Sequence, residues 1–416
     1  MKKPKTIDGV LAPFLFTLFL ISFLSLISLN TNATSNAFPD APLSQTAAPR
    51  LNQPSAASAA FEPGRAKKSK KAQIKIKRRA LHGVLLIDKP LGASSNQVLQ
   101  RVKWLLKAEK AGHTGTLDPL ASGVLPICLG AATKFSQLHL ECDKTYLAIA
   151  RLGQCTSTAD AEGEITHTQD ASALDLSAQG LQGVLSAFTG PIEQTPPMYS
   201  ALKVQGKALY EYARAGLELE LKARSVTIHA LEMKELRSAA DLESLSALAH
   251  WSVDEQWVHD LSAVHHTRAL AIKVTCSKGT YIRTLAQDIG NHLGVGAHLV
   301  YLRRVASGDF TIDQCMDLSA FEALTQSAES GEALSALKPT ECLLTGHEPI
   351  ALSESDAAKF LSGLRRKGPW RDCDRVAVYA QNPTVLLGSA HIKGGELIPD
   401  RLLNPLEINS ILESLL

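Results

Sequence analysis

The stretch from His113 to Gly130, HTGTLDPLASGVLPICLG, constrains this 416-residue chain more than any other. Its first half is rich in turn-forming residues, and its second half contains the apolar run 124–129, which predicts a buried segment. Pro119 fixes its own φ and keeps Asp118 out of the helical region. Three glycines allow positive φ or the close approach of a ligand: Gly112, Gly115 and Gly123. The stretch therefore predicts that Asp118 is presented on a constrained loop.

An aspartate before proline is often only a turn former or a helix cap, and that interpretation applies to Asp118 when it is considered alone. The wider string GHTGTLDPLASGVLPICLGAATK resembles the central motif of the TruB-type tRNA pseudouridine synthases. In that family the Asp of the matching GTLDP is the catalytic nucleophile. The resemblance therefore implies that Asp118 is a nucleophile.

Composition sets the class of protein. The chain is 45% hydrophobic and 20% charged, which is ordinary for a globular protein. Its 416 residues are enough for two domains plus tails. The net charge is only +2, so a nucleic-acid site must come from local clusters of Lys and Arg. The 7 cysteines are scattered and contain no CxxC pair, which argues against a disulfide framework or a structural zinc site and favours a reducing compartment.

The first 80 residues conflict with a cytoplasmic enzyme. Residues 9–29 are uncharged and long enough to cross a bilayer, as in a signal peptide or anchor. Residues 30–64 have the composition of a disordered linker. Residues 65–79 are basic with no acidic residue, which suits either contact with RNA phosphates or an anionic lipid surface, or a merely solvated linker. A start codon assigned too far upstream is a further alternative, because the folded pattern begins only near Leu81.

The folded part opens with HGVLLIDKPLGASSNQVLQRVKWLLKA. It predicts a strand over 84–87, a loop, and an amphipathic helix capped by Ser94 or Ser95 and ending near Ala108. Lys89 is expected in the loop, either as a phosphate contact or as a solubilising residue. The DKPxGxSS pattern also resembles the first motif of the same family.

Residues 144–165 alternate like a strand around Tyr146 and then enter the polar segment TSTADAEG. Tyr146 is either a half-exposed strand aromatic or, as the resemblance implies, the residue that stacks on the target base. Asp160 and Gly163 match the family pattern, and we expect Asp160 in a loop that faces tRNA. Ser157 stands where many members carry Asp, so the resemblance does not imply a contact from that position.

Residues 171–190 predict a helix, and 191–216 again resemble the family. Basic and aromatic side chains alternate there, as RNA backbone contact and base stacking require, although the tyrosines also suit plain helix packing: Lys203, Lys207, Tyr210, Tyr212 and Arg214. The segment 236–270 is longer than usual for the family and holds His250, His259, His265 and His266. No metal-ligand spacing supports a metal site there.

The last strong motif lies in residues 271–304 and predicts a strand over 272–276 and a helix over 280–292. Arg283 near that helix N-terminus opposes the helix dipole and needs a partner, most naturally a carboxylate. The family resemblance of GTYIR implies that the partner is Asp118. It also implies that Tyr281 and Leu302 line the uridine pocket.

The implied reaction turns uridine into pseudouridine by an isomerisation that needs no cofactor. It requires an ionised carboxylate, although burial raises the pKa of an acid, and a base flipped out of the RNA stack. His113 is expected to fill the vacated space, Tyr146 to stack on the base, and Leu302 to close the apolar wall. Either a tyrosine or a water removes the C5 proton.

The resemblance covers about residues 81–404 and implies an α+β fold: a catalytic domain (81–345) with a large, mainly antiparallel sheet, then a small β-rich PUA-like domain (346–416). The expected substrate is uridine 55 in the T loop of tRNA. We expect no metal, no obligate protein partner and a cytoplasmic monomer. Two other classes stay open, an idle RNA-binding module and a membrane-anchored or exported protein.

Overall fold

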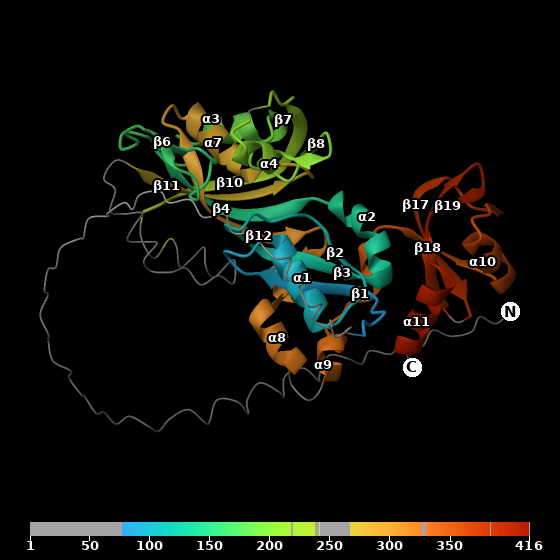
Figure 1. Ribbon diagram of the computed structural model, residues 1–416. Coiled ribbons are helices and arrows are strands. Elements are labelled where there is room, and N and C mark those ends of the chain that lie inside the picture. Colours follow the sequence, from blue (N-terminus) through green and yellow to red (C-terminus); the bar gives the residue numbers. More distant parts are fainter. Residues whose placement is uncertain are drawn as a thin grey trace, which may run out of the picture. The chain divides into compact units, whose positions relative to one another are not determined.

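The structure is a computed structural model that describes residues 77–217, 219–237, 241, 267–326, 330–382 and 384–415 (Figure 1). The apolar run 9–29, most of the basic run 65–79 and the four histidines between 236 and 270 lie outside the described residues. In the part of the chain that is described, no helix is both long and apolar enough to span a membrane.

A 10-stranded sheet forms the centre of the catalytic part, in the order β14-β1-β3-β12-β4-β11-β10-β7, with β2 on β3 and β13 on β12 (Figure 1). Its strands are β1 (Gly83–Lys89), β2 (Ala111–His113), β3 (Ala121–Leu129), β4 (Lys144–Leu152), β7 (Gly190–Gln194), β10 (Arg224–Leu236), β11 (Arg268–Cys276), β12 (Ala297–Ser307), β13 (Phe310–Thr311) and β14 (Met316–Asp317). Among these described strands, β1 with β14 and β12 with β3 pair in parallel, and the other pairs are antiparallel. The expected mainly antiparallel sheet is confirmed.

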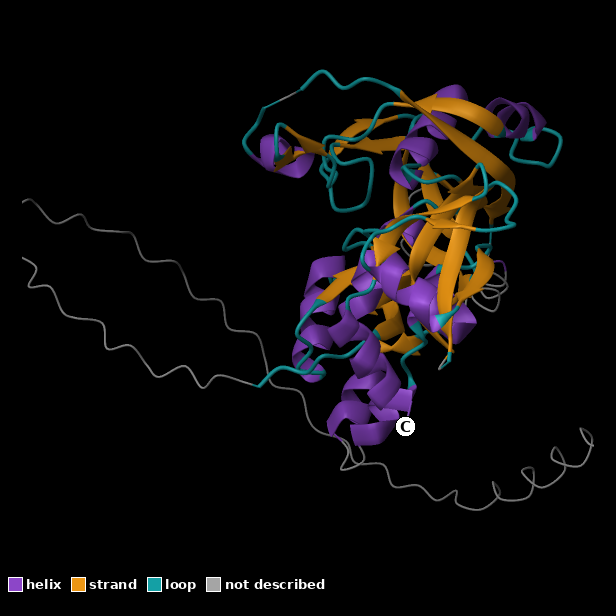
Figure 2. Ribbon diagram, turned by 90° about the vertical axis from the view of Figure 1, so that its right-hand side faces the viewer, coloured by secondary structure: helices purple, strands orange, loops and turns teal. Residues whose placement is uncertain are grey.

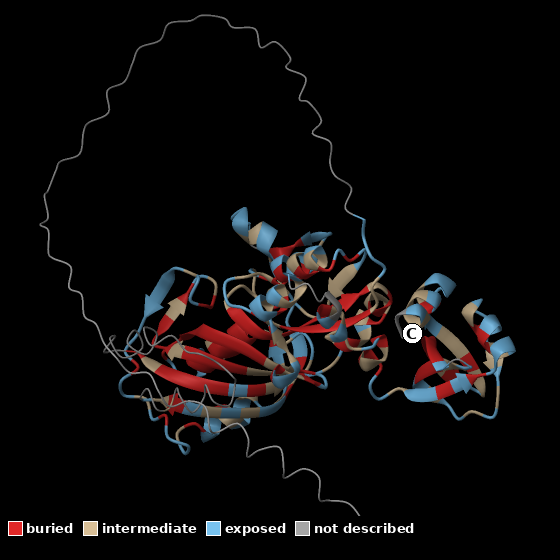
Figure 3. Cartoon of the chain, turned by 90° about the horizontal axis from the view of Figure 1, so that it is seen from below, coloured by how far each residue is buried: buried red, intermediate tan, exposed pale blue. Residues whose placement is uncertain are grey.

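Strand β3 is buried along its whole length, because both faces of the sheet are covered there. Alternate residues of its neighbour β1 point to opposite faces. Leu85 and Ile87 pack with helices on one face, whereas Val84 and Leu86 join the core of the C-terminal sheet on the other. Figure 3 shows the central strands as the continuously buried part of the molecule. The site described below is therefore built on the best-packed strands.

Gly123 in β3 shows how closely the central strands approach. Its φ is +107°, and a Cβ at this position would lie 2.2 Å from the backbone oxygen of Arg304 in β12. A side chain is thus excluded by the neighbouring strand as well as by the backbone conformation. Gly123 was expected to allow positive φ or the close approach of a ligand. Its φ is positive, and the group that approaches it closely is the backbone of β12.

The helices and 3-10 turns around this sheet are short: α1 (Ser95–Leu105), η1 (Gly130–Lys134), α2 (Ser136–Leu140), α3 (Gln182–Phe188), α4 (Leu209–Arg214), α7 (Ile282–His292), η2 (Ile312–Gln314), α8 (Leu318–Gln326), α9 (Ser330–Ser335) and η3 (Thr340–Leu343). Helix α1 packs with α8 on one face of the sheet, and α3 and α7 share the core of the other end (Figure 1). Figure 2 shows helices packed against the strands. Two small hairpins complete this part: β5 (Gln154–Thr156) with β6 (Ile165–Thr168), and β8 (Lys203–Val204) with β9 (Lys207–Ala208).

The predicted helix over 171–190 was wrong for most of its length, because only Gln182–Phe188 is helical. Asp170 and Asp175 each accept a hydrogen bond from the backbone two residues on, at Ser172 and Ser177. Such side-chain-to-backbone bonds stabilise turns in competition with a helix.

The C-terminal part is a 5-stranded sheet in the order β15-β17-β18-β19-β16. Its elements are β15 (Glu348–Leu352), α10 (Glu354–Leu361), β16 (Arg366–Lys367), β17 (Cys373–Gln381), β18 (Thr384–Lys393), β19 (Glu396–Leu402) and α11 (Pro405–Leu415). Gly394 and Gly395 form the tight turn between β18 and β19 with φ of +60° and +73°, as a type I′ hairpin requires. Phe360 and Val376 belong to the same buried cluster as Val84 of β1. The β-rich C-terminal unit expected from the sequence is confirmed.

Candidate active site

A cavity of about 270 Å³ lies where the central strands meet the turn before α7. Its walls come from the loop after β2, from β4, from residues 200–201, from the turn between β11 and α7, and from β12. The lining residues are Gly115, Thr116, Leu117, Asp118, Leu140, Lys144, Tyr146, Ser200, Ala201, Ser277, Lys278, Gly279, Thr280, Tyr281, Ile282, Arg283, Leu302 and Arg304. Five of the residues singled out from the sequence are thus brought together: Asp118, Tyr146, Tyr281, Arg283 and Leu302.

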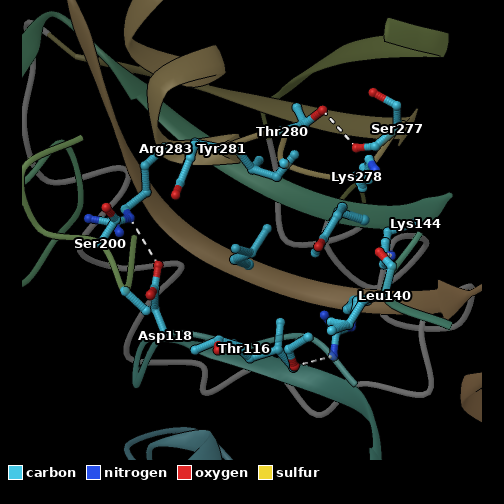
Figure 4. Close-up of a pocket in the computed structure, with 18 residues that line it drawn as sticks. Thr116, Asp118, Leu140, Lys144, Ser200, Ser277, Lys278, Thr280, Tyr281 and Arg283 are labelled. Carbon is cyan, nitrogen blue, oxygen red and sulfur yellow. Dashed lines mark hydrogen bonds and ion pairs between the residues drawn. The ribbon is translucent and has the colours of Figure 1, made fainter. Parts of the chain in front are cut away.

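Asp118 and Arg283 face each other at one end of this cavity (Figure 4). The Nε of Arg283 lies 3.0 Å from Oδ2 of Asp118. The backbone oxygen of Asp118 accepts a hydrogen bond from Ala121, which closes the loop before β3. An ion pair therefore spans the loop after β2 and the first turn of α7.

The Arg283 guanidinium has partners on every side. Its Nη1 donates to the backbone oxygen of Thr158 at 3.1 Å, and its Nη2 donates to that of Tyr199 at 2.6 Å. Nη1 also lies 3.4 Å from Oδ2 of Asp160. Two carboxylates and two carbonyl oxygens thus compensate a cation that the helix dipole alone would disfavour.

Asp160 was expected in an RNA-facing loop; it lies in the loop between β5 and β6, but its side chain is buried. The residue is 2% exposed. Its carboxylate accepts hydrogen bonds from the Thr158 hydroxyl and the Glu162 backbone, and it pairs with Arg283. A buried carboxylate of this kind needs a cation close by, which explains its position behind the Asp118 ion pair.

The electrostatics of Asp118 combine opposing effects. Its partial burial raises the pKa of its carboxyl group above the usual value, and the nearby Asp160 charge raises it further. Arg283 and Lys89 act in the opposite direction and favour the carboxylate. The side chain keeps an exposed fraction of 38%, so a ligand in the cavity can reach it.

Tyr146 lies on β4 directly opposite Arg304 of β12. Arg304 is 1% exposed, and its Nε donates to the backbone oxygen of Val124 at 2.8 Å. Its guanidinium also reaches the Tyr146 hydroxyl and the Gly115 backbone oxygen. Burial raises the pKa of Tyr146, an effect that Arg304 opposes. The tyrosine is thus held at the cavity wall by a buried cation.

Leu302 and Tyr281 give the cavity an apolar and aromatic part of its wall. Leu302 is buried on β12, in register with Ala121 of β3 and Ala148 of β4. Tyr281 is the residue before α7, and its backbone exchanges two hydrogen bonds with the Gln194 side chain. Both residues stand where the sequence motif required pocket-lining groups.

His113 is the last residue of β2 and is half-buried, but it is not among the residues that line the cavity. Within the described part of the chain, its buried Nδ1 has no hydrogen-bond partner. Burial and the nearby Arg304 charge lower the pKa of His113, so the neutral ring is favoured.

Lys89 was expected in a loop with access to phosphate, and this was wrong. It is the last residue of β1 and has no exposed surface. Its Nζ donates to the backbone oxygens of Pro90 and Ala93, and burial lowers its pKa to about 8. Lys203, in contrast, is exposed in the β8–β9 hairpin.

Arg304, Lys144 and Ser200 were not singled out from the sequence. Lys144 is buried and donates its Nζ to Leu140 and Cys142 backbone oxygens, and Ser200 carries a buried hydroxyl without a partner in the described residues. The signal for Arg304 was its place beside Arg303 in a strand with several apolar residues, because a buried arginine is almost always paired. No group of three metal-ligating side chains occurs in the described part of the chain.

The chain was compared with known families and proteins. The family model described as TruB family pseudouridylate synthase (N terminal domain) matches residues 103–282, and that described as tRNA pseudouridylate synthase B C-terminal domain matches 283–345. A tRNA pseudouridine synthase B from Verminephrobacter eiseniae is 52% identical over 82% of this chain and 95% of its own length. One from Cupriavidus pinatubonensis is 45% identical over 79% and 96%.

The chain belongs to the TruB family of pseudouridylate synthases. Members of this family are isomerases, and the TruB resemblance expected from the three sequence motifs is confirmed. Solved structures share the fold of this TruB-family enzyme at low identity. A Cbf5-Nop10-Gar1 complex contains a chain with a TM-score of 0.55 and 24% identity, covering 79% of this chain and 86% of that one. A chain of an H/ACA RNP bound to a substrate RNA has a TM-score of 0.53 and 23% sequence identity. This match covers 78% of this chain and 86% of that one.

Proposed function

We propose that this TruB-family isomerase converts uridine 55 in the T loop of tRNA to pseudouridine, with Asp118 as the nucleophile. The observation that carries the proposal is the Asp118–Arg283 ion pair at the end of a cavity large enough for a flipped base. The names of the curated relatives, tRNA pseudouridine synthase B, support tRNA as the substrate.

The chemistry begins with the carboxylate. Asp118 attacks either C1′ of the ribose or C6 of the uracil, and the N1–C1′ bond breaks. The uracil turns and C5 bonds to C1′, which displaces the carboxylate if it was attached at C1′, whereas a carboxylate attached at C6 leaves C6 afterwards. C5 then loses its proton to a base and N1 takes up a proton, so the nucleotide keeps its composition. Atoms and electrons balance within the nucleotide, so the isomerisation needs no redox partner or cofactor. Arg283 keeps Asp118 ionised against the effect of burial, as the nucleophile requires.

The cavity wall suits an extruded uracil. Tyr146 stacks on the flipped base, Leu302 and Tyr281 close the pocket, and Arg304 holds Tyr146 in place. His113, at the end of β2 and outside the cavity, fills the space that the base leaves in the RNA. Removal of the C5 proton falls to Tyr146 or to a water.

RNA affinity comes from surfaces outside the pocket. Lys203, Lys207 and Tyr210 are exposed in and beside the β8–β9 hairpin, and Arg214 lies over the Tyr210 ring at 5.3 Å. Basic and aromatic groups of this kind bind phosphates and unstacked bases. We assign catalysis to residues 81–345 and contact with the rest of the tRNA to the PUA-like unit 346–416, in an enzyme that acts as a monomer without a protein partner.

The test is Asp118→Asn, which keeps the size of the side chain and removes its charge and nucleophilicity. Tritium release from C5-labelled uridine in a T-loop RNA is expected to fall to background, while filter binding at one fixed salt concentration stays within a few-fold of the parent protein. Asp143→Asn is the matched control, because Asp143 is exposed and pairs with His229. Tritium release by Asp118→Asn would refute the nucleophile. Tight binding without any release by the unmodified protein would instead favour an RNA-binding module.

Pseudouridine mapping tests the position. In tRNA from cells that lack this gene, loss of pseudouridine at position 55 alone is expected. Retention of that modification, or loss at another position, would contradict the assignment to the T loop.

A further inference from the structure

The segment that carries the first motif, residues 88–95, runs directly beneath the loop of Asp118. The hydroxyl of Ser95 donates to the backbone oxygen of Leu117 at 3.0 Å and accepts from the backbone N–H of the same residue at 2.8 Å. On the other side of Asp118, the backbone N–H of Gly92 donates to the oxygen of Pro119 at 2.9 Å. Both neighbours of Asp118 are therefore held by one short segment.

The Ser95 hydroxyl uses its single donor and one of its two acceptor positions on Leu117. A serine offers one O–H donor and lone pairs that accept, and both distances lie in the normal range for hydrogen bonds. Ser95 is 1% exposed, so water does not compete for either bond. A side chain that satisfies both backbone groups of one residue leaves that residue a single orientation.

Ser95 is itself held by rigid structure. It is the first residue of α1, whose N-terminus is closed by the capping box of Ser94 and Gln97. The buried face of α1, formed by Val98, Leu99 and Val102, packs into the core beside β1 and β3. The loop before Ser95 is tied to the end of β1, because Lys89 Nζ donates to the Pro90 and Ala93 oxygens.

We infer that Ser95 is a positioning residue for the reaction: its doubly hydrogen-bonded hydroxyl fixes the backbone at Leu117 and so aims the Asp118 carboxylate at the substrate and at Arg283. This rests on the proposed role of Asp118. A nucleophile displaced by about 1 Å loses a large part of its rate without any change in its chemical identity, so the contribution of Ser95 lies in the rate of the chemical step and not in RNA affinity.

The experiment compares Ser95→Ala with Ser94→Ala. Ser94 is the adjacent serine, and its hydroxyl caps α1 by accepting from the Gln97 backbone at 3.2 Å, whereas its hydrogen bonds do not involve the loop 114–120. Both substitutions remove one hydroxyl at the same helix end. If Ser95 only stabilises the helix, the two variants lose similar amounts of stability and of rate. If Ser95 positions the loop, only Ser95→Ala loses rate.

The readouts are single-turnover tritium release, the Kd of T-loop RNA and the melting temperature, with rates measured well below both melting temperatures. Ser95→Ala is expected to slow release by about 10- to 100-fold with a Kd within about twofold of the parent protein. Ser94→Ala is expected to lower the melting temperature and leave the rate unchanged. If Ser95→Ala does not fold, Ser95→Cys keeps the volume, weakens both hydrogen bonds and is expected to show the same loss of rate.

Equal rates in the Ser94 and Ser95 variants, or a change in Kd that accounts for the loss of rate, would overturn the inference. That result is distinct from failure of the proposed function, in which the unmodified protein itself releases no tritium.

Discussion

The Arg283 guanidinium holds the Asp118 carboxylate from a position that is closed to solvent: the Arg283 side chain is 5% exposed, against 38% for Asp118. A substrate can therefore reach the carboxylate without displacing the arginine. In this ion pair the arginine is buried and only the carboxylate is accessible.

Arg283→Ala is expected to reduce tritium release by a factor of hundreds or more. Removing the cation leaves the buried Asp160 without its cationic partner and Asp118 with only the more distant Lys89 charge, at a cost on the order of 3 to 5 kcal/mol. Arg283→Lys is the informative companion, since an ammonium cannot reproduce the planar fork that reaches both carboxylates and the two carbonyl oxygens. Near-normal turnover of the alanine variant would remove the ion pair from the mechanism.

The pH dependence of the unmodified enzyme follows from the raised pKa of Asp118. The nucleophile must be ionised, so the single-turnover rate is lost as the pH falls through that pKa. Because the pKa is raised, the loss is expected at a higher pH than for an ordinary aspartate. The measurement is the single-turnover rate as a function of pH, with circular dichroism at each pH to check that the protein stays folded. A flat profile down to the usual range of aspartate would contradict this prediction.

Asp160 has two effects that Asp160→Asn separates: its charge raises the pKa of Asp118, and its carboxylate anchors Arg283. Removing its charge lowers the pKa of Asp118, so the acid limb of the rate profile moves to lower pH. The plateau rate is expected to drop about tenfold or more, because Arg283 loses one of its anchors. Pre-steady-state rates across the acid range measure both. An unchanged limb would show that Asp160 acts on Arg283 alone.

Gly123→Ala is expected to be strongly destabilising, because its Cβ would meet the Arg304 backbone at 2.2 Å. Gly206→Ala is the matched control: its φ is also positive, at +84°, but nothing lies within 4 Å of the added carbon. The control is expected to cost about 1 to 2 kcal/mol for the left-handed backbone, and Gly123→Ala more than about 2 kcal/mol beyond that. Urea denaturation of both variants gives the comparison, and equal losses would mean that the strands separate easily.

A protein that begins at Lys77 is expected to keep full activity on T-loop RNA. It retains Arg78 and Arg79, which bond to Ala108 and Lys107 beside α1. Tritium release and RNA binding at two salt concentrations provide the measurement. A weaker salt dependence in the shortened protein would instead show that the basic run 65–76 contributes phosphate contacts.

The sequence was most informative where a residue type has few alternatives. Arg283 at a helix N-terminus needed an acid, and the motif resemblance gave the one it contacts. Burial of polar side chains was not predictable from local pattern. Lys89 and Asp160 look like loop residues in the sequence, yet both are enclosed by elements far along the chain, including β12 and α7. The contact of Ser95 with Leu117 likewise depends on how the first two motifs cross in space.

Strand β12 pairs with β3 on one side and β4 on the other, and it carries Leu302 and Arg304 between them. Strands in the middle of a well-packed sheet are among the last parts of a protein to open. The β12 wall of the pocket therefore lies where local unfolding is rare, whereas the loops that carry Asp118 and Tyr281 complete the pocket from outside the sheet. Adaptation to different RNA substrates is then expected from the β8–β9 hairpin, which contributes no residue to the lining of the pocket.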